Sequence, residues 1–173
     1  MERLSFWQLV DHPNAQQAAI DASKHNLEHF WWYINTVFER ALDASPLWIC
    51  LPEGDHELRM KYPDAPVFET TSDTEQFKRH MDSLLVVIAP NEQAYALRFY
   101  QPRYLHGWLQ HIELSRLSEF LGPISAIKWR LDSEDYAVKN PTKVQKTEGR
   151  DVAWFHLTDI DWQQLKLAYI QSN

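Results

Sequence analysis

The chain has 173 residues and a formal net charge of −7, with 45% hydrophobic and 24% charged residues. Its length suits one ordinary domain, or one core with a small lobe, and its composition is that of a folded globular chain. The negative charge argues against a nucleic-acid-binding surface, because phosphate contacts need clustered cations. One cysteine, Cys50, excludes a disulfide framework and a multi-cysteine zinc site.

Nothing in the sequence indicates a membrane span or an export signal. No apolar run approaches the roughly 20 residues that a transmembrane helix needs. The N-terminal apolar stretch is too short for a secretory signal and has Glu2 and Asp11 around it. We therefore expect a cytoplasmic protein that binds neither membrane nor nucleic acid.

The first third of the chain mixes candidate strands and helices. Residues 4–10 are typical of a strand that ends at the turn signal around Pro13. Residues 15–45 are ambiguous, because their alanine-rich start favours a helix whereas FWWYI could be a buried strand. If the strand covers about 29–33, a short helix follows it through Val37, Phe38 and Ala41.

The next segments are a strand, a connection and a helix. LWICL, at 47–51, is a short apolar run that predicts a strand, with Cys50 as a buried thiol. Residues 52–73 are rich in Pro, Asp and Glu and indicate an exposed connection. Ser72 and Glu75 have the spacing of a capping box, which predicts the start of a helix. Its apolar positions are Phe77, Met81, Leu84 and Leu85.

A hairpin is expected after this helix. Residues 84–89, LLVVIA, have no polar side chain, which is typical of a strand covered on both faces. The turn PNEQ joins them to 94–100, so we expect an antiparallel hairpin at the centre of the sheet. In such a strand Arg98 and Tyr100 face the side opposite to Leu97 and Phe99.

The remaining elements are helical. Pro102 suits the first position of a helix, and a second apolar stripe ends at Gly122-Pro123. The polar, lysine-bearing residues 131–150 predict a loop or linker. Thr158 and Asp161 resemble a capping box that starts a last helix. The two stripes are Leu105, Trp108, Leu109 and Ile112, then Leu114, Leu117, Phe120 and Leu121, and the last helix continues through Trp162, Leu165 and Tyr169.

These elements predict a mixed α/β fold. We expect a central sheet of about five strands flanked by helices, followed by a small helical C-terminal lobe. The corresponding division is an α/β domain at 1–130, then a linker and helical appendage at 131–173.

No catalytic or metal-binding pattern stands out. His25 and His29 are four residues apart, as in some helical metal sites, but no third ligand is marked. His106 and His111 are five apart and do not share a helical face. The carboxylates of the run Asp132, Glu134 and Asp135 suit a solvated linker better than paired acid–base catalysis. We therefore expect no enzyme activity, no metal and no cofactor.

The stretch YALRFYQPRYLHGWL, at 95–109, has two interpretations. In the structural one, Arg98 is an internal residue that holds a neighbouring loop, because a buried arginine needs a partner. In the functional one, Arg103, Tyr104 and Trp108, together with Tyr100, form a protein-binding surface, since Arg, Tyr and Trp dominate binding hot spots.

The same stretch, followed by LSEFLGPISAIKW, resembles the signature of the type VI secretion effector adaptors, also called effector chaperones. The likeness covers roughly residues 5–130 and also favours strands at FWWYI and LWICL. One position departs from the pattern: Gln101 replaces the usual Asp, which is a better helix cap. The matching residues are Arg98, Phe99, Tyr100, Pro102 and Arg103, then Phe120, Gly122, Pro123 and Trp129.

The resemblance implies a non-enzymatic adaptor. Such a protein binds a secreted effector in the cytoplasm and loads it onto the valine-glycine-repeat spike of the secretion needle. The effector and the spike are then its expected partners. Two alternatives remain: a small metal- or histidine-dependent hydrolase using His25, His29 or His106, and a nucleic-acid-binding module using residues 139–150.

Overall fold

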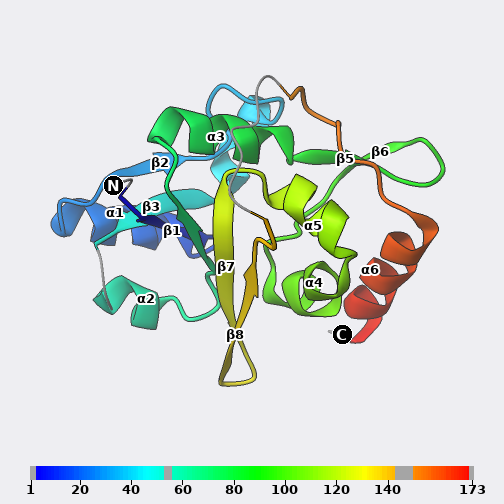
Figure 1. The fold of residues 1–173 in the computed structure, drawn as a ribbon. Coiled ribbons are helices and arrows are strands. Elements are labelled where there is room, and N and C mark those ends of the chain that lie inside the picture. The colour runs from blue at the N-terminus through cyan, green and yellow to red at the C-terminus, as the bar shows by residue number, and fades with distance from the viewer. Residues whose placement is uncertain (1–2, 53–55, 143–149, 172–173) are drawn as a thin grey trace.

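The computed structural model describes residues 3–52, 56–142 and 150–171. It has a mixed α/β fold around a six-stranded antiparallel sheet with the strand order β2-β3-β1-β4-β7-β8 (Figure 1). A separate two-stranded sheet is formed by β5 and β6. The strands are β1 Ser5–Val10, β2 His29–Trp31, β3 Leu47–Leu51, β4 Val67–Thr70, β5 Val86–Ile88, β6 Ala94–Ala96, β7 Ile124–Leu131 and β8 Glu134–Lys139.

Helices cover both faces of the large sheet, because its strands bury side chains on both sides. Trp7, Trp48 and Phe68 face the larger core, which includes residues of α3, α4 and α5. Ile49 and Val67 face a smaller core with α1 and α2. The helices are α1 Ala15–Lys24, α2 Glu57–Lys61, α3 Thr74–Ser83, α4 Pro102–Gly107, α5 Leu114–Leu121 and α6 Asp159–Gln171, with short 3₁₀ turns η1 Glu39–Ala44 and η2 Leu109–His111.

Several predicted elements are confirmed. Strands lie at β1, β2 and β3, and the helices α1, α3, α4, α5 and α6 are all present. The expected capping box of α6 forms in full: the Thr158 amide donates to Asp161 at 2.8 Å, and the Asp161 amide donates to the Thr158 hydroxyl at 3.1 Å. In α3 the cap is Asp73, which accepts from the Gln76 amide at 2.8 Å, and the predicted cap at Ser72 is wrong. Glu75 instead pairs with Arg79 one turn later.

The expected exposed connection at 52–73 is wrong between residues 57 and 70, and residues 53–55 of it lie outside the described residues. It contains α2 and the inner strand β4, which pairs with both β1 and β7. Four residues, VFET, are too few to show the alternation that identifies a strand, so only tertiary pairing reveals them.

The expected linker after residue 131 is also wrong where the structure describes it. Strand β8 pairs with β7 across a tight turn in which Asp132 and Ser133 have φ of 51° and 67°. The strand is polar because it is an edge strand with mostly exposed side chains. The hairpin therefore continues across residue 130, and residues 143–149 of the expected linker lie outside the described residues.

The hairpin β5–β6 is confirmed as a hairpin, but its place at the sheet centre is wrong. It forms its own sheet, all of β6 is exposed, and in β5 only Val87 is fully buried. The other edge of β5 bonds to the segment before α6, through the Ile88 amide to the Phe155 carbonyl and the Leu157 amide to the Ile88 carbonyl. Within the described ranges, no helix has the length and apolar character needed to cross a membrane.

Candidate functional site

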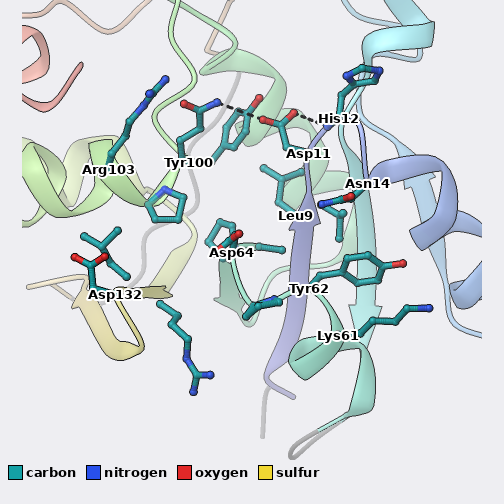
Figure 2. Close-up of a pocket in the computed structure, with 18 residues that line it drawn as sticks. Leu9, Asp11, His12, Asn14, Lys61, Tyr62, Asp64, Tyr100, Arg103 and Asp132 are labelled. Carbon is teal, nitrogen blue, oxygen red and sulfur yellow. Dashed lines mark hydrogen bonds between the residues drawn. The ribbon is translucent and has the colours of Figure 1, made fainter. Parts of the chain in front are cut away.

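A cavity with a polar rim lies beside the residues that resemble the adaptor signature. This cavity, of about 550 Å³, is open to solvent and is called here the corner pocket. Figure 2 shows Arg103 and Asp132 on one side of it and Asn14 and Lys61 on the other. Its walls are the end of β1 and the following turn, the α2–β4 connection, residues 100–103, and the β7–β8 turn.

Residues 97–101 form a turn rather than the end of a strand, so the expected alternation of side chains is wrong. Phe99 and Tyr100 are both buried, at 0% and 4% exposure. Arg98 is half-exposed and lies 3.9 Å from an Asp11 carboxylate oxygen. It contacts a neighbouring loop as expected, but not as a buried arginine, because the chain has already left the sheet here.

The helix that follows starts as predicted, with Pro102 at its first position. Gln101 is the N-cap residue, yet its side chain makes no capping hydrogen bond. Its amide instead reaches the Asp11 carboxylate at 3.5 Å. Gln101 thus leaves the helix start uncapped by a side chain and joins the turn to the end of β1.

The four residues expected at a protein-binding surface divide into two pairs. Trp108, at 0% exposure, and Tyr100, at 4%, belong to the core, and of these two only Tyr100 reaches the corner pocket. Arg103 and Tyr104 are half-buried. The Arg103 guanidinium lies over the Tyr104 ring at 4.9 Å and over the Tyr169 ring of α6 at 5.6 Å. Arg103 and Tyr100 both line the corner pocket.

The two halves of the signature pack against each other. The rings of Phe99 and Phe120 meet edge to face, with centroids 4.9 Å apart and planes at 89°. Phe120 also contacts Trp108 at 5.4 Å. The Pro123 carbonyl accepts a 2.7 Å hydrogen bond from Thr70 of β4. The paired motifs are therefore one buried junction, made by residues that are distant in sequence.

Gly122 ends α5 as predicted, and its conformation explains why glycine is present. Its φ is +51°, and a Cβ atom there would lie 2.7 Å from Cε1 of His80. His80 is buried and its Nε2–H donates to the Phe120 carbonyl at 2.9 Å. Burial lowers the pKa of His80 to about 4, so the ring is neutral at ordinary pH.

Charges around the corner pocket are partly used within the chain. Lys61 pairs at 2.6 Å with the buried Asp21, which also accepts from the Tyr62 hydroxyl at 2.6 Å. The hydrogen bonds from Lys61 and Tyr62 hold the pKa of Asp21 low, at about 2. On the opposite side, Arg130 pairs with Asp135 at 3.0 Å.

Two carboxylates at the pocket stay available for a ligand. Asp64 and Asp132 line it and are exposed, and no ion pair joins either one to another residue in the described ranges. Lys61 and Arg130 are already paired inside the chain, and the guanidinium of Arg103 lies over the Tyr104 and Tyr169 rings. The exposed carboxylates Asp64 and Asp132 therefore add negative charge at the side of the rim formed by the α2–β4 connection and the β7–β8 turn. Such a rim favours a ligand segment that carries Lys or Arg.

The histidines considered for catalysis make ordinary structural contacts. His25 pairs with Glu57 at 2.8 Å, His29 bonds to the Leu27 carbonyl, and the ring of His106 packs on that of Tyr136 at 4.4 Å. Within residues 3–52, 56–142 and 150–171, no group of three His, Cys, Asp or Glu side chains is placed to hold a metal ion. Cys50 is half-buried rather than buried, and burial raises the pKa of its thiol.

The sequence identifies Asp161 only as a helix cap, but in the structure it also has two distant partners. Asp161, at 3% exposure, also accepts from the Trp108 indole at 3.1 Å and pairs with Arg116. It therefore joins α6 to Trp108, just after α4, and to Arg116 of α5. The capping pattern of Thr158 and Asp161 indicated the helix start, but no sequence signal marks the two distant partners.

A comparison with protein families gives one match. A family model described as a domain of unknown function (DUF4123) matches residues 6–119, which is more than half of the chain. No curated protein and no solved structure gives a match. The matched range runs from β1 through the corner to the last turn of α5, and so includes Phe99 and Arg103. The chain belongs to the DUF4123 family.

Proposed function

We propose that this chain is a non-enzymatic cytoplasmic adaptor that binds a type VI secretion effector and loads it onto the valine-glycine-repeat spike. The observation that carries the proposal is the packing of Phe99 on Phe120, edge to face at 4.9 Å. This contact explains why the two halves of the adaptor-like signature occur together, because each half supplies one ring of the same buried pair. The likeness then concerns one three-dimensional unit rather than two short, unrelated strings of residues.

The corner pocket supports a polypeptide ligand. Its volume of about 550 Å³ is enough for a few side chains, and the signature residue Arg103 forms part of its wall. The exposed Asp64 and Asp132 at its rim suit a basic segment of the effector or spike. Opposite charges at a rim mainly steer and select a partner, which fits an adaptor that recognises one cognate effector.

The hydrolase alternative receives no support from the positions of its histidines. His25 and His29 do not share a helix face, because α1 ends at Lys24 and His29 starts β2. His106 packs on Tyr136. Each of these imidazole rings thus makes a structural contact, and no catalytic role is needed to explain it.

The test is capture of the proteins encoded beside this chain. The tagged full chain is co-expressed with a neighbouring toxin and spike, and the complex is quantified after affinity purification. We expect both proteins to be retained, and Asp64→Lys with Asp132→Lys to reduce retention of one of them at least about tenfold. The matched control, Asp43→Lys with Glu119→Lys, makes the same charge change at exposed positions outside the pocket lining.

Three results would contradict the proposal. The first is failure of the wild-type chain to retain either protein under conditions where the partners are folded. The second is equal loss of retention in the pocket variant and its control. The third is turnover of an ester or phosphoester substrate by the purified chain alone.

A further inference from the structure

The outer face of α6 is unusual for a surface helix. Ile160, Leu167 and Ile170 are exposed there at 71%, 57% and 65%. The inner face buries Leu165 and Ala168, the latter against α4, where a Cβ on Gly107 would lie 2.8 Å from that of Ala168. Figure 1 shows α6 at the edge of the molecule, with α4 on its inner side. A helix with apolar side chains on both faces normally has neighbours on both faces.

The exposed side chains form a regular seam. Ile160, Gln163, Leu167 and Ile170 follow the spacing i, i+3, i+7, i+10, and all four are exposed. This is the alternating three- and four-residue repeat by which one helix packs along another. An extended peptide is a poorer fit, since strand addition needs the unpaired backbone groups of a sheet edge. The seam is thus shaped for a helix.

The area of the seam limits what can cover it. The three apolar side chains expose on the order of 400 Å², which is half of the roughly 800 Å² that each partner buries in a standard stable complex. A second copy of this chain, bound through the seam alone, would therefore be held weakly. One helix of another protein needs no larger contact, because it can be anchored elsewhere by the rest of that protein.

The charges beside the seam also disfavour a second copy. If two α6 helices packed antiparallel with Ile160 opposite Ile170, the exposed Lys166 of each would face its own copy. The same flank also has the exposed Asp159 at the first residue of α6, one heptad before Lys166, whereas Gln164 and Gln171 on the other flank carry no charge. A helix with an acidic residue next to its apolar seam complements Lys166 instead.

We propose that the outer face of α6 docks an amphipathic helix of a partner protein, with apolar residues at heptad spacing and an acidic flank. This inference rests on the proposed adaptor function, because a protein that joins an effector to a spike needs two surfaces. None of the seam residues lines the corner pocket. Helix α4 lies between the two surfaces: its Arg103 lines the pocket and contacts Tyr169 of α6.

The first experiment measures helix binding without any natural partner. Fluorescent peptides of about 20 residues carry the heptad apolar pattern with glutamate flanks, the same pattern with lysine flanks, or a scrambled order. We expect the full chain to bind the glutamate-flanked peptide best. Leu167→Gln with Ile170→Gln should weaken that binding at least about tenfold. Val37→Gln with Met60→Gln is the matched control at similarly exposed positions, 60% and 63%, and should bind as the wild type does.

Several results would overturn the inference. Equal binding of the scrambled peptide, or equal binding by the α6 variant, would remove the seam as a helix-docking site. Dimerisation that the α6 variant abolishes would assign the seam to a second copy. Adsorption to phosphatidylglycerol vesicles that the same variant abolishes would assign it to a lipid surface. Thermal unfolding of each variant verifies that the substitutions leave the fold intact.

The second experiment separates this inference from the adaptor proposal. In the capture of toxin and spike, Leu167→Gln with Ile170→Gln should lose one protein, and Asp64→Lys with Asp132→Lys should lose the other. If both proteins are captured and the α6 variant keeps both, the seam inference fails and the adaptor proposal stands. If neither is captured while the α6-dependent peptide binding persists, the adaptor proposal fails and helix docking stands.

Discussion

The buried and exposed residues of the 98–108 segment differ sharply in environment, although they are close neighbours along the chain. Phe99 and Trp108 are completely buried, whereas Arg98 is half-exposed and Arg103 half-buried at the pocket wall. The two rings attach the segments before and after α4 to the core, and the guanidinium groups stay at the surface. One short motif therefore combines a folding role with a surface role. Mutations should therefore separate stability from binding.

The largest effect is expected at the centre of the junction. Phe120→Ala removes a fully buried ring that contacts Phe99, Trp108 and Phe155, and should lower the free energy of unfolding by about 3–5 kcal/mol. Urea unfolding followed by tryptophan fluorescence measures it. A loss below about 1 kcal/mol would mean that the two motif halves do not depend on each other.

Gly122→Ala should have the next largest effect. The added methyl group meets the ring of His80 at 2.7 Å, and a φ of +51° is unfavourable for alanine. We expect a loss of about 1–3 kcal/mol in the free energy of unfolding. The double variant Gly122→Ala, His80→Ala tests the cause, since removal of the ring should recover the part due to the clash. No recovery would attribute the whole effect to the backbone.

A pH effect should follow from His80. Burial lowers its folded-state pKa to about 4, below the value of about 6.5 in an unfolded chain. The unfolded state therefore binds more protons in this window, so stability falls as pH drops from about 6.5 towards 4. We expect a loss on the order of 1 kcal/mol between pH 7 and pH 5.5. His80→Gln does not titrate, and a profile as steep as the wild type's in that variant would exclude His80 as the cause.

The smallest effect is expected at Arg98. Its side chain is half-exposed and lies 3.9 Å from Asp11, so Arg98→Ala should change the free energy of unfolding by less than about 0.5 kcal/mol. Thermal unfolding at low and high salt measures this. A drop of several degrees in Tm would mean that Arg98 stabilises the fold. It would contradict the separation between buried rings that stabilise the fold and arginines that stay at the surface.

The predictions from sequence succeeded where the signal is local. The cap of α6, Pro102 at the start of α4 and Gly122 at the end of α5 all depend on backbone groups within a few residues, so the sequence contains the whole cause. They failed at β4 and β8. A four-residue inner strand and a polar edge strand show no alternation, because their pairing partners rather than their own side chains hold them in place.

The candidate site shows the same division. Arg103 was singled out from the sequence, and it does line the corner pocket. The pocket itself was not foreseen, because β1, the α2–β4 connection and the β7–β8 turn meet there only after folding. Residue type alone predicts Trp108 at a binding surface, because tryptophan is common in binding sites. Its indole is instead bonded to the buried Asp161, which lies far along the chain.

What the sequence determined by itself is the helices other than α2, the β5–β6 hairpin and the aromatic motif, since propensities and caps act over a few residues. Only the tertiary structure decided which aromatic rings are buried, which charges remain free at the pocket, and which face of α6 is left exposed. The physical reason is that burial and pairing depend on segments far apart in the chain, and the free energy of each contact exists only when both sides are in place.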